Sequence, residues 1–494
     1  MADYYFDGNN GNDTTGAGTE ANPYKSIKAS TVGGAFNPAN ARFFIKRGTT
    51  VLMAGEIHPN GSFKFASYGP TTDPKGKVVY NYGGSYFLAT GTGAVSTDTI
   101  EFDQLQFEDA SSSSFTSAVY QNDLGSGKIV VTDCDIVNFY NGVITQRGTG
   151  HQILRCNITG SRNNGIIIEH ATVAAPSNVL IADNYVDAST ALNDAIVLHN
   201  GTSDGYGNVI RDNVIISGYE QAIDVVAMFP GTHILRNVVY TNPAPNTSLA
   251  EIFCRGKNSV IKGNLVFTKT REGGALQIDN TDITVACNAF IPTAGQAGGP
   301  SVYVLAPALG SKIFNNLFYM PASYAKISIL VASGVTTGLS KNNLFINYSA
   351  DSGCRFLTAL TVADLATWDI DNNYYVQMPG SYATPWAGAR TFADWILTAG
   401  TPDNGTAIVA TDSPIVVPSY QTVGQRFNLQ KILTIAGDSP LVEVGQHINY
   451  QVDMNGSQFW NPPAIGPVEY RRPRTARDSF FFSLTDAMFY APLS

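Results

Sequence analysis

Cysteine, charge and long apolar runs are all scarce in this sequence. Five cysteines among 494 residues are too few and too irregular for a disulfide framework, so we expect buried free thiols. Charged residues make up 14% and the net charge is −9, which argues against nucleic acid or an anionic membrane as the partner. No apolar run approaches a membrane span, and the opening MADYYFDG lacks a secretion signal. We expect no cofactor and no metal.

One short pattern recurs between Asn164 and Asn288. A strand-like phrase such as NGIIIEH or DAIVLHN is followed by a second phrase in which an asparagine precedes apolar residues. These asparagines are Asn184, Asn213, Asn237, Asn264 and Asn288, and the series extends to Asn157 before them and to Asn316, Asn343 and Asn373 after them. Their spacing of 24 to 30 residues indicates a solenoid.

Composition decides between the kinds of solenoid. The repeats are rich in Val, Ile, Tyr, Phe and Thr, are interrupted by Gly and Asn, and show no helical apolar stripe. The Leu-x-x-Leu-x-Leu frame of leucine-rich repeats is also missing. The sequence therefore predicts an all-β protein, a parallel β-helix in which each coil lies about 4.8 Å above the previous one.

The asparagine column is interpreted as structural. An asparagine at a turn tolerates left-handed backbone angles, and stacked copies can bond from one coil to the next. Cys134, Cys156 and Cys287 are placed one position before the ladder, with Cys134 and Cys156 as stacked neighbours. A disulfide between these two is possible, but free thiols are favoured.

Several segments resemble the right-handed parallel β-helix superfamily that includes pectate lyase-like proteins. Residues 4–28 are similar to its amino-terminal cap, with a Tyr-Tyr strand, a Gly/Asn/Asp loop and a Pro-Tyr-Lys-Ser-Ile helix start. Phe43–Gly76 resembles its first coils, and Gly466–Tyr470 its closing segment. The resemblance implies a right-handed β-helix with an N-terminal cap and irregular C-terminal coils.

The same resemblance divides the chain into four parts. We expect the cap and first coils in residues 1–75, the parallel β-helix in 76–375, C-terminal coils in 376–470 and a tail in 471–494. The tail begins with basic residues and ends with aromatic ones, so it either packs on a neighbouring subunit or assembly or is disordered.

Alternation along the repeated strands separates inward from outward side chains. The inward pairs are apolar: Ile166/Ile168, Ile196/Leu198, Ile223/Val225, Ile252/Cys254 and Leu276/Ile278. One outward column contains Ile167, Val197, Asp224, Phe253 and Gln277, and the column beside it contains Glu169, His199, Val226, Arg255 and Asp279. So many ionisable groups on one flank of a lightly charged chain indicate a candidate catalytic site formed by Glu169, His199, Asp224, Arg255 and Asp279.

Two reactions fit these residue types. Glu169 and Asp224 are two coils apart, about 10 Å plus a lateral offset, which is at or beyond the upper edge of the roughly 6.5–9.5 Å used in inverting glycoside hydrolysis. His199 with Arg255 could instead serve a uronate lyase. The segment around Arg255 resembles the lysine region of the alginate lyase and chondroitinase B-like family. That family's second basic residue is missing, because the next coil has Gln277 and Asp279.

Substrate contacts are expected from Phe253, Gln277, Tyr219 and Phe229, because aromatic rings stack on the apolar faces of sugars. Tyr206 offers a further ring. The competing interpretation is that each charged residue only forms a surface ion pair and that each ring only packs a loop.

Three functions remain open. The first is a tailspike-like protein of a bacteriophage virion, a homotrimer that binds and cleaves a bacterial surface polysaccharide in a groove on the β-helix flank and contacts other tail proteins through residues 471–494. The second is a secreted polysaccharide lyase or hydrolase whose signal was removed. The third is a non-catalytic spike. All three place the protein on a virion or outside the cell.

Overall fold

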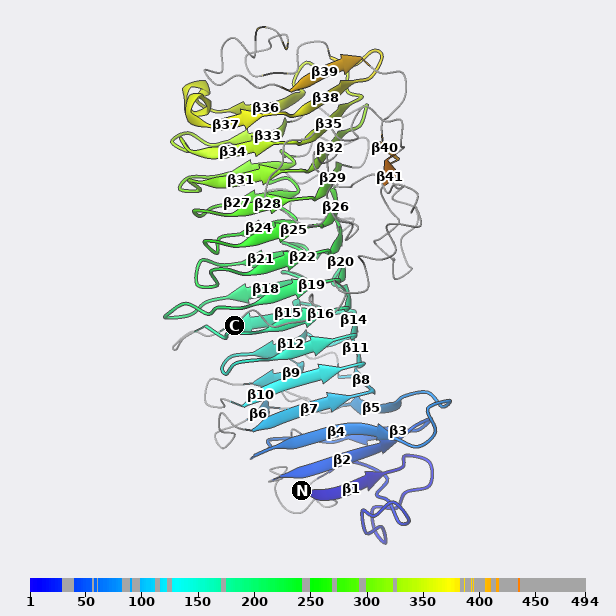
Figure 1. The fold of residues 1–494 in the computed structure, drawn as a ribbon. Helices are drawn as coiled ribbons and strands as arrows, with labels where there is room; N and C mark the ends of the chain where they lie inside the picture. Colours follow the sequence, from blue (N-terminus) through cyan, green and yellow to red (C-terminus); the bar gives the residue numbers. More distant parts are fainter. Residues whose placement is uncertain are drawn as a thin grey trace, which may run out of the picture.

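The computed structural model describes residues 1–28 and 40–382, apart from positions 56 and 60 and the segments 82–88, 91–97, 112–115, 122–126, 170–174, 242–248, 269–272, 293–298 and 323–326. Further along the chain it describes positions 386, 392 and 394 and residues 405–409, 415–416 and 434–435. Within these ranges the chain winds into a stack of coils that rises from β1 to β39 (Figure 1). The predicted all-β solenoid is confirmed.

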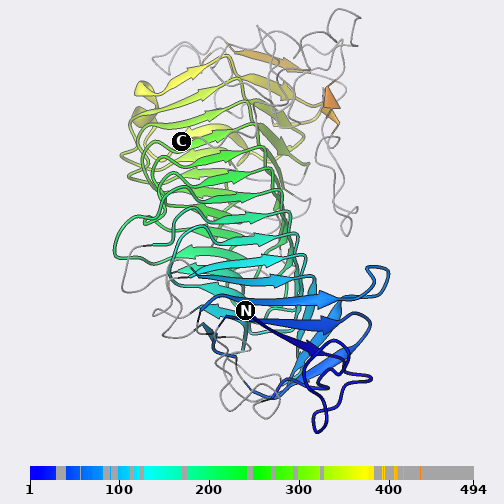
Figure 2. The ribbon, with the colours of Figure 1, turned by 60° about the horizontal axis from the view of Figure 1, so that its bottom comes forward.

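Three parallel sheets run along the stack, and Figure 2 shows their strands lying over one another. Sheet I contains β1 (Ala2–Phe6), β2 (Ala41–Lys46), β4 (Phe63–Tyr68), β7 (Thr99–Asp103), β10 (Lys128–Thr132), β13 (Gln152–Leu154), β16 (Leu180–Ala182), β19 (Val209–Arg211), β22 (His233–Leu235), β25 (Val260–Lys262), β28 (Thr284–Ala286), β31 (Ser311–Phe314), β34 (Gly338–Lys341) and β37 (Asp369–Asp371).

Sheet II contains β3 (Thr50–Met53), β5 (Gly76–Tyr80), β8 (Leu105–Asp109), β11 (Asp135–Val137), β14 (Asn157–Thr159), β17 (Tyr185–Asp187), β20 (Val214–Ile216), β23 (Val238–Tyr240), β26 (Leu265–Thr268), β29 (Ala289–Pro292), β32 (Leu317–Met320), β35 (Leu344–Asn347), β38 (Tyr374–Gln377) and β39 (Thr406–Val409). Sheet III contains β6 (Ala89–Thr90), β9 (Ser117–Gln121), β12 (Asn141–Thr145), β15 (Asn164–Glu169), β18 (Ile196–His199), β21 (Ile223–Val225), β24 (Ile252–Cys254), β27 (Leu276–Ile278), β30 (Val302–Val304), β33 (Ile327–Val331) and β36 (Arg355–Ala359).

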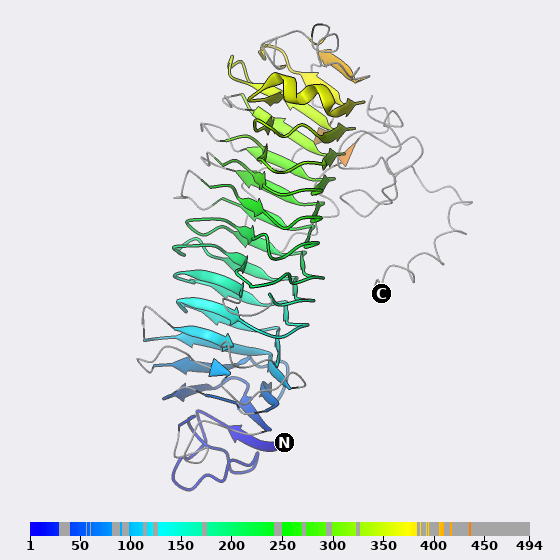
Figure 3. The same cartoon turned by 90° about the vertical axis from the view of Figure 1, so that its left-hand side faces the viewer.

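Two small elements complete the description. A 3-10 helix, η1 (Val362–Thr367), follows β36, and Figure 3 shows it beside the last coils. An antiparallel pair joins β40 (Ile415–Val416) to β41 (Thr434–Ile435). The predicted helix start of the cap, residues 23–27, is not helical: Tyr24 and Ile27 form isolated parallel bridges to Phe6 and Met53 instead. Most of the C-terminal coils and the tail 471–494 were expected in residues that lie outside the described ranges, so these two remain predictions.

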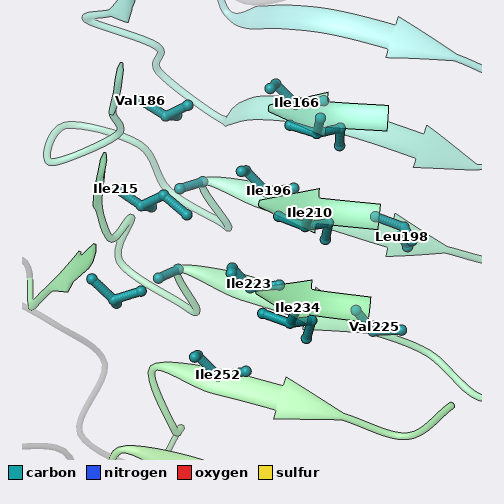
Figure 4. Packing of buried hydrophobic residues seen from close by; sticks show 14 of the residues in the cluster. Ile166, Val186, Ile196, Leu198, Ile210, Ile215, Ile223, Val225, Ile234 and Ile252 are labelled. Carbon is teal, nitrogen blue, oxygen red and sulfur yellow. The ribbon is translucent and has the colours of Figure 1, made fainter. Parts of the chain in front are cut away.

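The core lies inside the coils. Strand residues that point inward meet from all three sheets, and Figure 4 shows Ile196 and Leu198 of sheet III together with Ile210 of sheet I and Ile215 of sheet II. Burying each such side chain fully contributes about 1.5–3 kcal/mol. Because the same apolar pair recurs at the same height in every coil, the repeat fixes the register of sheet III.

The corner between sheets I and II holds the asparagine ladder. From Asn184 to Asn373, the side-chain Oδ1 of each ladder residue accepts a hydrogen bond from the backbone N–H of the ladder residue one coil earlier. The left-handed angle is adopted by the residue before each asparagine, for example Asp183 and Asp212, and not by the ladder residue itself. The asparagine therefore stabilises the corner through its buried side-chain amide and not through a left-handed backbone.

The start of the ladder differs from the prediction. Asn157 pairs with Tyr185, one position past the column, whereas Cys156 and Cys134 occupy the ladder position, and only Cys287 lies one place before it. The N–H of Cys156 donates to Asn184 Oδ1, so the first hydrogen bond of the ladder joins this cysteine to Asn184. All five cysteines are free and buried, as predicted.

The outer face of sheet II changes along the stack. The outward residues of β14 and β17 are half-buried, but from β23 to β35 the outward residues are almost all buried and apolar. They form a second cluster that includes Val238, Tyr240, Leu265, Phe267 and Ile346. Sheet III differs, because several of its outward side chains, such as Glu169, His199 and Gln277, are polar and partly exposed, which leaves this face accessible to a soluble ligand.

Candidate functional site

Strand register brings the predicted site residues onto one flank of sheet III. Val197 pairs with Asp224, Asp224 with Phe253, and Phe253 with Gln277, which is the first outward column. Glu169 pairs with His199, and the backbone hydrogen bonds of Val226, Arg255 and Asp279 to the preceding coils continue the second column beyond the strand ends. We call Glu169, His199, Val226, Arg255 and Asp279 the flank row.

Glu169 and His199 form one end of the flank row. The Nδ1 atom of His199 lies 3.9 Å from Glu169 Oε2, an ion-pair distance rather than a hydrogen bond, and Gln146 Nε2 donates to Glu169 Oε1 at 3.1 Å. The nearby Glu169 carboxylate raises the pKa of His199, although partial burial acts in the opposite direction. His199 therefore favours its charged form and is better suited to hold a carboxylate than to act as a neutral base.

The buried Asp224 and the half-buried Arg255 form an ion pair at the centre. Arg255 Nη2 donates to both carboxylate oxygens of Asp224, at 3.0 and 2.9 Å, and the guanidinium lies over the ring of Phe253 at 4.5 Å. Only 8% of the Asp224 side chain is exposed, and this burial raises its pKa although Arg255 acts to lower it. Asp224 is thus a carboxyl that binds a proton more readily than an exposed aspartate.

Asp279 and Val226 complete the flank row. Burial raises the pKa of Asp279, with Arg255 again acting against it. Val226 packs on the core between His199 and Arg255, so the row of charged side chains is interrupted directly beside Asp224. The carboxyl groups around Val226 therefore lie in different environments, which is the distribution that acid and base roles require.

The predicted substrate-binding residues have different outcomes. Phe229 is 0% exposed and belongs to the core, so the prediction that its ring contacts a sugar is wrong. Tyr219 is exposed but precedes β21, at the opposite end of the strand from the flank row. Phe253 and Gln277 lie on the flank and are half-buried, with the face of Phe253 already covered by Arg255.

Two buried acids near the site were missed by the sequence reasoning. Asp194 lies two residues before β18 and Glu251 directly before β24, and both are almost completely inaccessible. Asp194 Oδ1 accepts the backbone N–H of Gln221 at 2.7 Å, and burial raises the pKa of Asp194 to about 8, with the Asp224 charge acting in the same direction. An acidic residue one or two positions before an apolar strand was the available signal.

Replacing Asp194 with asparagine is expected to change how stability depends on pH. Between about pH 4 and 8 the unfolded chain has lost this proton while the folded chain keeps it, so wild-type stability falls as pH rises, by up to about 1.4 kcal/mol per pH unit. The variant lacks this loss, and its melting temperature relative to wild type should rise from pH 5 to pH 8. A constant difference across this range would contradict a protonated Asp194.

Neither a metal cluster nor a membrane helix occurs in the described part of the chain. No three His, Cys, Asp or Glu side chains there are arranged to hold a metal ion. No apolar helix of membrane-spanning length occurs in those residues either.

Comparison with known proteins gives structural neighbours. No protein-family model and no curated protein matches the sequence. PfbA, a surface adhesin of Streptococcus pneumoniae, is similar with a TM-score of 0.49 and 12% identity over 65% of this chain and 84% of that one. The catalytic unit of a GH87 alpha-1,3-glucanase from Streptomyces thermodiastaticus has a TM-score of 0.41 and 14% identity over 77% of this chain and 66% of that one. The periplasmic alginate epimerase AlgG has a TM-score of 0.38 and 11% identity over 67% of this chain and 76% of that one.

These likenesses concern the fold. Three parallel sheets, wound from one repeated coil with an asparagine ladder at one corner, make this chain a parallel β-helix.

Proposed function

We propose that this protein binds a bacterial surface polysaccharide on the outer face of sheet III and hydrolyses it. The observation that carries the proposal is the buried Asp224, whose pKa is raised and which lies two coils from the more exposed Glu169. Two carboxyl groups in such different surroundings are suited to the acid and base roles of glycoside hydrolysis. The support comes from this site, because the likeness to the glucanase and the epimerase is one of fold.

The proposed reaction is an inverting hydrolysis. Protonated Asp224 gives its proton to the glycosidic oxygen as the bond to the anomeric carbon breaks. Glu169 takes a proton from the water that attacks this carbon from the opposite face. Two coils separate the carboxyl groups by about 10 Å before their lateral offset, so side-chain reach is needed to hold one water between them. His199 lies beside Glu169, and Arg255 orients Asp224.

A lyase mechanism is less well supported. Arg255 is already bound to Asp224, and the next coil carries Gln277 and Asp279 in place of a second basic residue. The raised pKa of His199 also disfavours it as the base that would remove a proton beside a uronate carboxylate. Hydrolysis therefore uses the observed charges better.

We also propose that the protein acts outside a cell as a trimeric tailspike of a bacteriophage virion, with residues 471–494 contacting other tail proteins. Low charge, turn-rich coils and a ligand site on the flank suit such an elongated spike. The mass in solution tests the assembly: a trimer is expected, and a monomer at micromolar concentration contradicts it.

Incubation with purified capsular and lipopolysaccharide glycans tests the activity. We expect new reducing ends from at least one glycan, without the ultraviolet absorbance of an unsaturated uronate. Absorbance that grows with the reducing ends would establish a lyase instead. Binding without any new ends would leave a non-catalytic spike.

A further inference from the structure

The loop between β18 and β19 presents an aromatic ring on a closely fitted backbone. Its sequence GTSDGYGN places Tyr206 between two glycines. A Cβ atom on Gly205 would lie 2.4 Å from the carbonyl oxygen of Pro176, and one on Gly207 would lie 2.4 Å from Asn178 Oδ1, with Gly207 also at φ +72°. Because only glycine fits at these positions, the loop lies directly against the loop of the preceding coil.

Hydrogen bonds hold this loop from both neighbouring coils. The Tyr206 N–H donates to Ser177 Oγ at 3.1 Å, and its carbonyl accepts from the Asn178 N–H at 2.7 Å. On the other side, the Gly205 N–H donates to the Met228 carbonyl at 2.8 Å. The backbone that carries Tyr206 is therefore fixed before any ligand arrives, which reduces the entropy lost on binding.

The ring itself remains exposed but oriented. Tyr206 is 56% exposed, and its hydroxyl donates to Asp204 Oδ2 at 2.9 Å. A large ring held in water contributes nothing to the core, whereas a pre-oriented ring is a low-cost platform for the flat, hydrogen-lined face of a hexopyranose.

The loop that carries Tyr206 begins at the flank row. His199 is the last residue of β18, and the loop begins at the next residue. Asp204 also contacts Lys257 from the loop after β24, at 3.6 Å, so the Tyr206 loop extends past the coil of Asp224 toward that of Arg255. The next coil gives a second link to the row, because Met228, which accepts the Gly205 N–H, lies two residues after Val226.

The charges here favour a neutral sugar. Lys257 is paired with Asp204, and His199 lies beside Glu169. The Arg255 guanidinium donates to both oxygens of Asp224 and lies over the ring of Phe253, so each of these cations already has a partner within the protein. The Asp279 carboxyl lies on the same flank, and its negative charge when ionised would oppose a carboxylate or phosphate on the glycan.

We propose that Tyr206 forms a substrate subsite for a neutral hexopyranose unit, so that the glycan is a neutral polysaccharide rather than a polyuronate or a sialic acid polymer. The inference rests on the proposed function, since the row is taken to bind the same chain. It adds two things to that function. The first is a substrate-contacting residue that is not one of the catalytic groups, and the second is the chemical class of the glycan.

Tyr206→Ala and the matched Tyr206→Phe test the subsite with neutral and acidic capsular oligosaccharides, by calorimetric titration and cleavage kinetics. For the neutral ligand that wild type binds, the alanine variant should weaken affinity about tenfold and raise KM with little change in kcat. The phenylalanine variant keeps the ring and should stay within about twofold of wild type.

Three outcomes would overturn the subsite. Equal affinity of the alanine variant and wild type would remove Tyr206 from the site while leaving the proposed function intact. Preference for acidic over neutral ligands would refute the substrate class. Absence of binding and cleavage by wild type across the whole panel would instead refute the proposed function, and the subsite with it.

Discussion

Replacing Asp224 with asparagine should lower the rate of glycan cleavage by a factor of about 10² to 10⁴, the usual contribution of a general acid. The amide keeps the shape of the carboxyl and can still accept a hydrogen bond from Arg255, but it has no proton of the required acidity to give to the leaving oxygen. The initial rate of reducing-end formation measures the effect, and the melting temperature shows whether the variant stays folded. Affinity for the glycan should change far less than kcat.

A substrate with a better leaving group distinguishes the acid role from a merely structural one. An aryl glycoside of the cleaved sugar needs little protonation, so Asp224→Asn should slow its hydrolysis much less than that of the polysaccharide. Asp187→Asn on sheet II provides the matched control and should leave both rates unchanged, because Asp187 lies outside the site, where it accepts the Ser189 N–H at 3.0 Å. Equal losses on both substrates would show that Asp224 does not donate the proton.

The flank row could be predicted because two short-range rules suffice. Alternation decides which side chains point outward, and the repeated apolar pairs decide which strands lie over one another. Together they place Asp224 beside Phe253 and Glu169 beside His199, as the structure does. The ion pair between Asp224 and Arg255 follows from the same register, because the two residues are diagonal neighbours on adjacent coils.

The loops could not be predicted in the same way, because neither rule applies outside strands. Phe229 lies between β21 and β22, where no alternation fixes its direction, and the coil takes it into the core. The orientation of Tyr206 depends on contacts with loops of three other coils. Burial is also a property of the assembled fold, and for this reason the raised pKa of Asp194 could not be read from its position in the chain.

The error at Asn157 has a simple structural cause. The dipeptide Cys-Asn occurs at residues 156–157 and again at 287–288, yet the cysteine takes the ladder position in the first case and the asparagine in the second. The ladder position lies three residues after the inward residue of the sheet I strand, which is Ile153 in one coil and Val285 in the other. Counting from the inward residue, rather than matching the asparagines, places the whole column correctly.

Replacing Asn237 with alanine, in the middle of this ladder, is expected to cost about 3–5 kcal/mol of unfolding free energy. Its amide makes four hydrogen bonds, to Asn213 N, Asn213 Nδ2, Ile210 O and Asn264 Oδ1. Every partner is buried in a corner that water does not reach, so the substitution leaves several polar groups unsatisfied, each costing about 1–3 kcal/mol.

Because coils contact only their neighbours, this loss should be local as well as global. Hydrogen exchange at the Asn213 N–H should accelerate at least a hundredfold, while amides in β4 should change little, and chemical denaturation should report the fall in stability. Asn157→Ala is the matched control, since it removes the same side chain one residue past the ladder column, and it should change stability by less than about 0.5 kcal/mol. Equal effects of the two substitutions would mean that the amide column does not hold the coils together, and that hydrophobic packing alone sets the spacing on which the alignment of Glu169, His199 and Arg255 depends.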